Sequence, residues 1–174
     1  MPAPVDLSSY VRDVPDWPEP GVVFKDITPL LADPGAFAAA VDALAEPFAD
    51  RGITKVVGIE ARGFLIGAPV ALRLGAGFVP VRKPGKLPGS TRSEEYALEY
   101  GTDALEIHTD AIGAGERVLV VDDVIATGGT AAATIRLVRS LGGTVVGIGV
   151  VIELAFLDGR AAVPGHELVP LLTY

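Results

Sequence analysis

Two adjacent carboxylates, Asp122 and Asp123, follow a short apolar run and precede a turn that contains two glycines. The run, residues 118–121, consists of aliphatic residues and is typical of a strand buried on both faces of a parallel sheet. Such a strand can end in charge only where it leaves the core, so we expect the two acids to mark its carboxyl end. Open α/β sheets usually bind their ligands at that edge. The pattern therefore predicts a ligand site around the acid pair.

The turn after the acids has the composition of a phosphate-binding loop. Thr127, Gly128, Gly129 and Thr130 precede a helix-forming run at residues 131–138. At a helix N-terminus, unpaired N–H groups and the positive end of the helix dipole converge, and glycine lets a phosphate approach them. The neighbouring carboxylates would repel that phosphate unless the ligand also carries hydroxyl donors or a cation, and vicinal ribose hydroxyls meet this need. Either half of the pattern alone also fits a plain strand followed by a capped helix.

Composition limits the class of protein. The 174 residues are enough for one domain with a substantial core, and 49% of them are apolar, yet no apolar run approaches the ~18 residues needed to span a bilayer. Cysteine is absent, and nothing at the N-terminus has the layout of a signal peptide. The net charge of -8 argues against nonspecific nucleic-acid binding. We expect a single cytoplasmic domain, residues 1–174, without nucleic-acid or membrane partners.

The order of the predicted elements indicates the fold class. Strands alternate with helices, and this alternation implies an α/β fold with a doubly wound, mostly parallel sheet flanked by helices. Residues 96–108 instead alternate polar and apolar with period two, as a β-hairpin does. A short amphipathic helix is expected at 6–14. The remaining strands are expected at 55–59, 78–81, 144–152 and 168–172, the last at a sheet edge because of Pro170, and the remaining helices at 34–48 and 65–74.

Cations also gather near predicted strand ends. Arg62, after the strand at 55–59, stands where a guanidinium can grip a phosphate with a bidentate fork, although it could instead pair with Glu60. The loop at 82–92 carries four positive residues in an otherwise acidic protein. A solvated loop would look similar, but a position after a strand end favours anion binding. The two histidines, His108 and His166, match no metal-site spacing.

Five segments, taken in order, resemble the adenine phosphoribosyltransferases, which are type I phosphoribosyltransferases. They are residues 20–29, Glu-x-Arg-Gly-Phe at 60–64, Arg-Lys-x-Gly-Lys-Leu-Pro at 82–88, Leu-Glu-Tyr-Gly at 98–101, and the acid pair with its glycine turn at 122–130. The resemblance implies transfer of the phosphoribosyl group of phosphoribosyl pyrophosphate to adenine, giving AMP and pyrophosphate for purine salvage. It also implies a homodimer, a base-binding segment at about 1–32, and a flexible lid at about 82–108. Mg²⁺ would be held mainly through the substrate, with no direct protein ligand.

The resemblance further implies a role for each matching residue. Backbone groups of Val23 and Lys25 would pair with the edge of adenine, while Phe24 would either stack on the base or belong to the core. Some relatives have Arg in place of Lys25, so the resemblance does not decide whether the Lys25 side chain contacts the base. The implied catalytic residues are Glu99 and Arg62, the phosphoribosyl-binding residues are Tyr100, Asp122, Asp123, Ala126, Thr127, Gly128, Gly129 and Thr130, and the pyrophosphate-binding residues are Arg62, Arg82, Lys83 and Lys86.

Three alternatives stay open on the sequence alone. The base could be hypoxanthine, guanine or xanthine, which present an oxo group where adenine presents its amino group. The chain could also be a non-catalytic regulator that senses phosphoribosyl pyrophosphate, although no segment is left over for a helix-turn-helix. Finally, Glu99 either handles the proton at the purine or is an ordinary solvent-facing residue on a strand.

Overall fold

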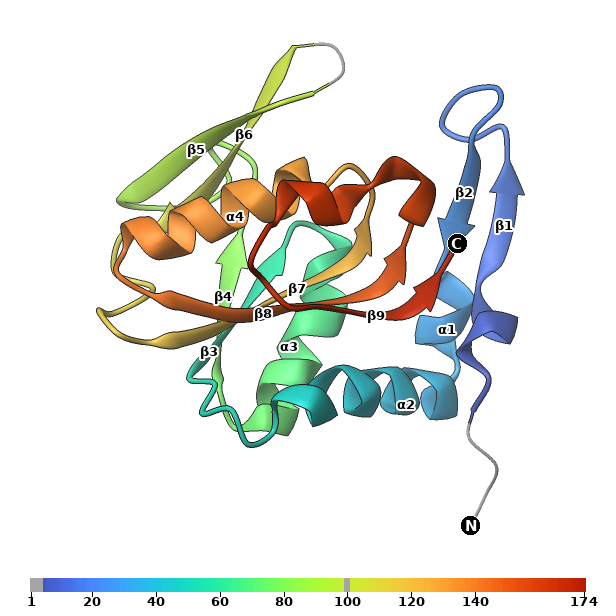
Figure 1. Ribbon diagram of the computed structural model, residues 1–174, viewed down its shortest axis with the longest axis horizontal. Helices are drawn as coiled ribbons and strands as arrows, with labels where there is room; N and C mark the ends of the chain where they lie inside the picture. Colours follow the sequence, from blue (N-terminus) through green and yellow to red (C-terminus); the bar gives the residue numbers. More distant parts are fainter. Residues whose placement is uncertain (1–4, 99–100) are drawn as a thin grey trace.

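The centre of the computed structural model, which describes residues 5–98 and 101–174, is a five-stranded parallel sheet (Figure 1). Its spatial order is β4-β3-β7-β8-β9, so in chain order the strands read 2-1-3-4-5 and the winding reverses between β3 and β7. Doubly wound sheets bind ligands at such a reversal. The predicted fold class is confirmed. The strands are β3 (Lys55–Ile59), β4 (Gly77–Val81), β7 (Arg117–Ile125), β8 (Thr144–Glu153) and β9 (Leu168–Thr173).

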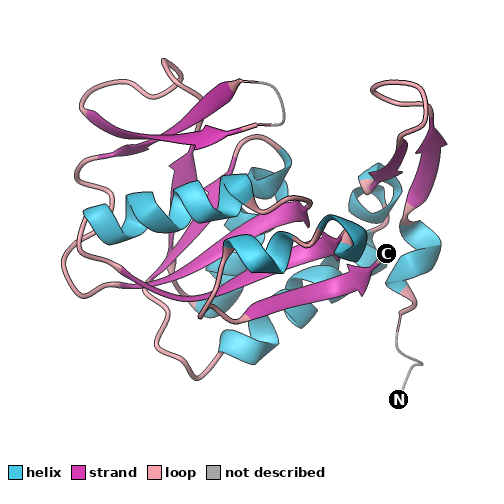
Figure 2. Cartoon of the chain, turned by 45° about the horizontal axis from the view of Figure 1, so that its top comes forward, coloured by secondary structure: helices cyan, strands magenta, loops and turns pink. Residues whose placement is uncertain are grey.

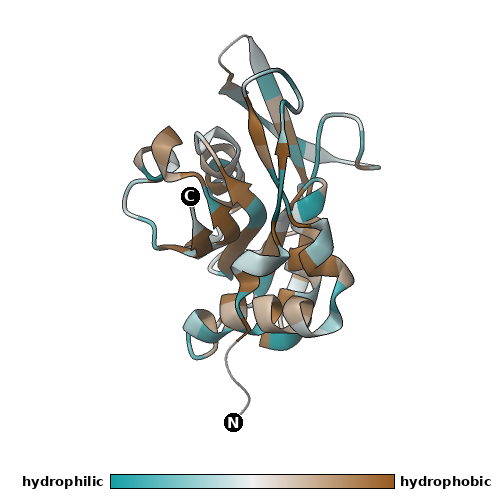
Figure 3. Cartoon of the chain, turned by 90° about the vertical axis from the view of Figure 1, so that its right-hand side faces the viewer, coloured by the Kyte–Doolittle hydropathy of each residue, from teal (hydrophilic) through white to brown (hydrophobic). Residues whose placement is uncertain are grey.

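Helices cover both faces of this sheet, and each face has its own apolar core (Figures 1 and 2). On one face, α1 (Thr28–Ala32), α2 (Pro34–Ala45) and α3 (Arg62–Leu74) bury side chains such as Leu44 and Ile66 against β3, β7 and β8. On the other, α4 (Gly129–Ser140) buries Leu137. The strands of the sheet are accordingly hydrophobic along most of their length (Figure 3). Among the described residues, no helix is long and apolar enough to cross a membrane.

Local signals explain where the helices begin and end. The Asp33 carboxylate accepts a hydrogen bond of 2.8 Å from the backbone N–H of Ala36, with Pro34 at the first helical position of α2. The same helix stops at Ala45, and Pro47 lies in the 3-10 turn that follows. α3 begins three residues earlier than the predicted 65–74, at Arg62. Arg62 is therefore part of the first helical turn.

The N-terminal segment differs from the prediction. The expected helix at 6–14 is wrong: Asp6 caps only a 3-10 turn, Leu7–Tyr10, and the chain then forms β1 (Arg12–Pro15). β1 pairs antiparallel with β2 (Val23–Asp26), and this separate two-stranded hairpin stands beside the end of β9 (Figure 1). The helical spacing of Leu7, Tyr10 and Val11 misled the prediction, because these residues pack on the core from the 3-10 turn and the residue that follows it.

The predicted hairpin at 96–108 is present but longer, with strands β5 (Thr91–Ala97) and β6 (Thr102–His108). It stands over α4 and packs Leu105 and Ile107 into the core of that face (Figure 2). Thr91 and Arg92 consequently belong to a strand, whereas we expected them in the cationic loop. The Arg92 guanidinium donates to the carbonyl of Ser140, the last residue of α4, at 2.8 Å. This contact satisfies a carbonyl at the end of α4 that has no partner within the helix, and it holds Arg92 in β5 beside that helix.

Candidate functional site

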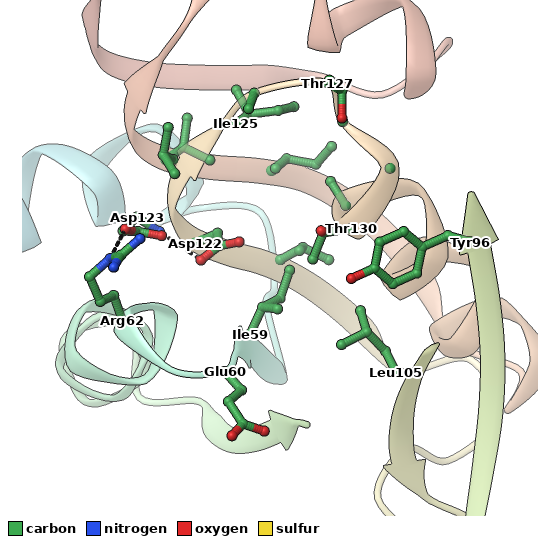
Figure 4. A pocket seen from close by; sticks show the side chains of 18 of the residues that line it. Ile59, Glu60, Arg62, Tyr96, Leu105, Asp122, Asp123, Ile125, Thr127 and Thr130 are labelled. Atoms are coloured by element: carbon green, nitrogen blue, oxygen red, sulfur yellow. Dashed lines mark hydrogen bonds and ion pairs between the residues drawn. The ribbon is translucent and has the colours of Figure 1, made fainter. Parts of the chain in front are cut away.

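The acid pair lies within β7, next to the reversal in strand order. We expected Asp122 and Asp123 to end the strand, but β7 continues to Ile125 because Val124 and Ile125 still pair with β8. Although Asp122 and Asp123 are consecutive in the strand, their carboxylates lie close enough for the charge of Asp123 to act on Asp122. Both carboxylates face the start of α3, Asp122 beside Gly63 and Asp123 beside Arg62 (Figure 4). Asp123 is buried, with 8% of its surface exposed.

A pocket of about 370 Å³ opens over this edge of the sheet (Figure 4). It brings together residues from β3, the loop after β4, the hairpin, β7 and the start of α4. Nine of the predicted site residues line it: Arg62, Lys83, Asp122, Asp123, Ala126, Thr127, Gly128, Gly129 and Thr130. Arg82, Lys86, Val23, Phe24 and Lys25 are not among its lining residues. Glu99 and Tyr100 lie outside the described residues.

The glycine turn forms the N-terminus of α4, as predicted. Gly128 is the N-cap residue with φ +82°, and no side-chain hydrogen bond caps the helix in the described part of the chain. A Cβ on Gly128 would collide with the carbonyl oxygen of Gly159 and lie 2.7 Å from the Cβ of Ala162. Glycine is therefore required both for the left-handed conformation and for the close approach of the loop at 158–162. The amides of the first helical turn face the pocket and suit an anion.

The two carboxylates of the acid pair have different partners. Arg62 donates from Nε to Oδ2 of Asp123, a short contact drawn as a dashed line in Figure 4. Asp122 accepts 2.8 Å from the backbone N–H of Asp123. Burial raises the pKa of Asp122 well above its usual value, and the adjacent carboxylate of Asp123 raises it further. Asp122 also lines the pocket, and hydroxyl donors of a ligand bound there would favour its charged form.

Glu60 holds Arg82, so the alternative in which Glu60 pairs with Arg62 is wrong. The Glu60 carboxylate accepts from Nε and Nη2 of Arg82 at 3.2 and 3.1 Å, and from the backbone N–H of Lys83 at 2.8 Å. The hydrogen bonds from Arg82 hold the pKa of Glu60 below its usual value. Glu60 points away from Asp122 and Asp123 in Figure 4. Arg62 pairs with Asp123 instead, because it starts α3 on the side facing β7.

A second polar cluster, which the sequence patterns did not reveal, joins the hairpin to the pocket. Lys83 donates from Nζ to the Asp103 carboxylate and lies 3.2 Å from the hydroxyl of Tyr96. Tyr96 and Asp103 are register partners in β5 and β6, and the Tyr96 hydroxyl donates to Asp103 at 3.2 Å. Burial alone would lower the pKa of Lys83, but its hydrogen bonds to Asp103 and Tyr96 outweigh burial and raise it. In the sequence, the only sign of this cluster was the alternation of polar and apolar residues that predicts the hairpin.

The predicted base segment lies next to Arg62 but outside the pocket lining. The ring of Phe24 is 5.0 Å from the Arg62 guanidinium and 4.5 Å, centroid to centroid, from the ring of Trp17. Phe24 belongs to neither apolar core, so its alternative assignment as a core aromatic is not supported. The side chain of Lys25 turns to Asp13, at 2.7 Å. This geometry leaves the aromatic ring and the backbone of β2 near the site.

Comparison with known proteins agrees with this geometry. The family model described as "Phosphoribosyl transferase domain" matches residues 27–162. The chain is 63% identical over 171 residues to the adenine phosphoribosyltransferase of Streptomyces coelicolor, covering 96% of this chain and 94% of that protein. It is 59% identical to the enzyme of Myxococcus xanthus, covering 97% and 92%.

Solved structures give the same result. The crystal structure of the adenine phosphoribosyltransferase from Rhodothermus marinus superposes with a TM-score of 0.93 at 57% identity, covering 97% of this chain and 96% of that one. The Saccharomyces cerevisiae enzyme, solved with adenine and an imino-altritol bisphosphate, superposes with a TM-score of 0.90 at 44% identity and covers 95% and 96%. The chain belongs to the adenine phosphoribosyltransferases, within the phosphoribosyltransferase family.

Proposed function

We propose that this chain transfers the phosphoribosyl group of phosphoribosyl pyrophosphate to adenine, releasing pyrophosphate and forming AMP for purine salvage. The proposal rests on one observation: Asp122 and the glycines at the N-terminus of α4 line the same pocket. That pocket lies where the strand order of the sheet reverses. Those two features suit a ribose diol and a phosphate held a few bonds apart on one ligand. High identity to adenine enzymes over almost the whole chain supports the choice of base.

In this proposal, the phosphate loop holds the 5-phosphate through its backbone amides. The loop is formed by Ala126, Thr127, Gly128, Gly129 and Thr130, and Asp122 and Asp123 accept hydrogen bonds from the ribose hydroxyls. Asp123 remains paired with Arg62, which extends the guanidinium toward the leaving pyrophosphate. Lys83 lines the same pocket and adds a second cation. Arg82 and Lys86 lie farther out, so we place them at the outer end of the pyrophosphate.

Adenine would bind between this pocket and β2. The sheet of β1 and β2 has only two strands among the described residues, so β2 pairs along a single edge. Val23 and Lys25 are two residues apart, and residues at that spacing direct their backbone groups to the same edge of a strand. That edge can donate to a ring nitrogen of adenine and accept from its amino group. A base with an oxo group there would leave a buried acceptor unpaired, at a cost of about 1 to 3 kcal/mol.

The chemistry requires opposite charges to be stabilised at once. Breaking the bond to pyrophosphate develops positive charge on the sugar and negative charge on the leaving group. Arg62 and Lys83 stabilise the leaving group, while Asp122 and Asp123 orient the sugar. A Mg²⁺ ion would be held mainly by oxygens of the pyrophosphate and the ribose. When bound, Mg²⁺ would neutralise part of the pyrophosphate charge.

Glu99 and Tyr100, which lie outside the described residues, would complete the proposed site. We propose that Glu99 handles the proton at the purine and that Tyr100 covers the phosphoribosyl group as residues 82–108 close as a lid. Replacing Glu99 with Leu should then lower the turnover number more than it weakens AMP binding. If turnover by Glu99→Leu equals that of the wild type, Glu99 has no part in the chemistry.

We further propose that the chain acts as one domain in the cytoplasm and forms a homodimer. Leu65 and Leu72 support the dimer, because they lie seven residues apart on α3 and are 51% and 83% exposed. Two large apolar side chains on one helix face favour contact with another protein surface.

The direct test is to measure pyrophosphate release from phosphoribosyl pyrophosphate with adenine, hypoxanthine, guanine and xanthine offered in parallel. The proposal expects release with adenine and little with the other bases. Release with an oxopurine in preference to adenine would assign the chain to that base instead. Binding of phosphoribosyl pyrophosphate without turnover of any base would indicate a sensor.

A further inference from the structure

The side chain of Lys25 is held from two sides. Its Nζ donates to Oδ1 of Asp13 at 2.7 Å and lies 4.0 Å from the centroid of the Tyr174 ring. Only 17% of the Lys25 side chain is exposed. Asp13 belongs to β1 of the same hairpin, so its contact stiffens the hairpin internally. Tyr174 comes directly after β9, so its contact with Lys25 connects the hairpin to the main sheet.

Tyr174 is itself firmly placed. Its backbone N–H donates to the carbonyl of Glu153 at 2.9 Å, and its carbonyl accepts from the N–H of Ala155 at 2.8 Å. Glu153 ends β8 and forms a two-pronged ion pair with Arg160, at 2.6 and 2.8 Å. The aromatic ring is thus anchored to the rigid part of the molecule, at the same edge of the sheet as the pocket.

A second contact holds the opposite face of β2. Phe24 and Lys25 are consecutive in the strand, so their side chains point to opposite sides. Phe24 meets the Arg62 guanidinium at 5.0 Å, and Lys25 meets Tyr174. At the base of the hairpin, the Asp26 carboxylate accepts from the backbone N–H of Thr28 at 2.9 Å. The strand is therefore positioned at its root and on both faces.

We infer that Tyr174 is a positioning residue for the base-binding strand. Its ring holds the Lys25 ammonium and thereby sets the backbone of Val23 and Lys25 at the correct distance from Arg62 and the pocket. This inference rests on the proposed function, in which that backbone pairs with adenine. It also gives Lys25 a role as an anchor, which explains why its side chain is directed away from the base site.

The inference is tested with Tyr174→Leu, which removes the aromatic face, and Tyr174→Phe, which keeps it. Steady-state KM values are measured separately for adenine and for phosphoribosyl pyrophosphate, using the full chain. Loss of the cation–π contact should raise the KM for adenine about three- to fivefold. The KM for phosphoribosyl pyrophosphate should stay at the wild-type value, because Tyr174 contacts the β1–β2 hairpin and does not line the pocket of Asp122 and the phosphate loop. Tyr174→Phe should behave like the wild type.

A second variant, Lys25→Met, removes the ammonium and keeps a long side chain. It should raise the KM for adenine by a similar factor, and combining it with Tyr174→Leu should add little, since both remove the same contact. If Tyr174→Leu leaves the KM for adenine unchanged, raises both KM values alike, or is matched by Tyr174→Phe, the positioning role is wrong. Failure of the wild type to use adenine would instead overturn the proposed function itself.

Discussion

Lys83 donates a hydrogen bond from its Nζ to Oδ2 of Asp103, and this contact ties a pocket cation to the β5–β6 hairpin. The ammonium also lies 3.2 Å from the hydroxyl of Tyr96, whose ring rests against the phosphate loop where a Cβ on Gly129 would lie 3.3 Å away. The hairpin thus contacts both Lys83 and the phosphate loop. A shift of the hairpin would therefore move Lys83 and the phosphate loop together.

Replacing Asp103 with Ala should weaken binding of phosphoribosyl pyrophosphate. The variant frees the Lys83 ammonium from its anchor, so the ammonium must be ordered again when the pyrophosphate binds. We expect kcat/KM for phosphoribosyl pyrophosphate to fall about three- to tenfold, a modest effect because both side chains are partly exposed. Glu94→Ala is the matched control, since it breaks an ion pair of the same hairpin with Arg136, away from the pocket. Tighter binding by Asp103→Ala would contradict the anchoring role.

Replacing Gly128 with Ala should damage stability and phosphate binding together. The added Cβ meets the Gly159 carbonyl and Ala162, and the residue must also adopt φ +82°. Conformational strain and overpacking together should lower the free energy of unfolding by roughly 2 to 4 kcal/mol. Gly115→Ala is the control, because Gly115 has φ +78° with open space around its Cβ position. Denaturant unfolding of both variants separates the two costs, and equal losses would show that the contact with Gly159 is unimportant.

Replacing Asp123 with Asn should retain the fold and abolish most turnover. The amide keeps the shape of the side chain but loses the charge that holds Arg62 and that, in the proposed function, fixes the ribose. Loss of such a transition-state contact should reduce kcat about 10²- to 10³-fold. Asp42→Asn is a suitable control, because it breaks a similar ion pair, with Arg73, remote from the acid pair. Turnover by Asp123→Asn at the wild-type rate would refute the assignment of Asp123 to the sugar.

The sequence predicted the main sheet well because each of its strands contains a mostly apolar run, and helix signals separate most of these runs. The start of α2 was equally predictable from Asp33 and Pro34. Contacts between distant segments were not predictable in this way. β7 runs past Asp122 only because β8 continues beside it, and the partner of Glu60 depends on how β4 brings Arg82 alongside.

The candidate site shows the same division. Gly128 and Gly129 were identified from the glycine turn itself, whereas Gly159 under the turn and Asp103 beside Lys83 come from other parts of the chain. The N-terminal segment was mispredicted because helical spacing over residues 7–14 is also satisfied by one turn followed by a strand that pairs with β2. Pairing between strands decides such cases, and local pattern does not report it.

Asp122 should make stability and AMP binding respond to pH in opposite directions. Its pKa is raised in the folded protein, so the native state binds a proton more tightly than the unfolded state does. Stability should therefore rise as the pH falls from the raised pKa toward the ordinary value of about 3.9 for Asp. AMP affinity should fall over the same window, because a protonated Asp122 is a poorer acceptor for ribose hydroxyls.

The measurement is AMP affinity by calorimetry, without metal, alongside denaturant unfolding across a pH series. The Asp122→Asn variant supplies the control, since an amide cannot titrate. The difference between wild type and variant should isolate the contribution of Asp122 to both curves. If the two proteins show the same pH dependence of AMP affinity, protonation of Asp122 does not govern binding of the sugar.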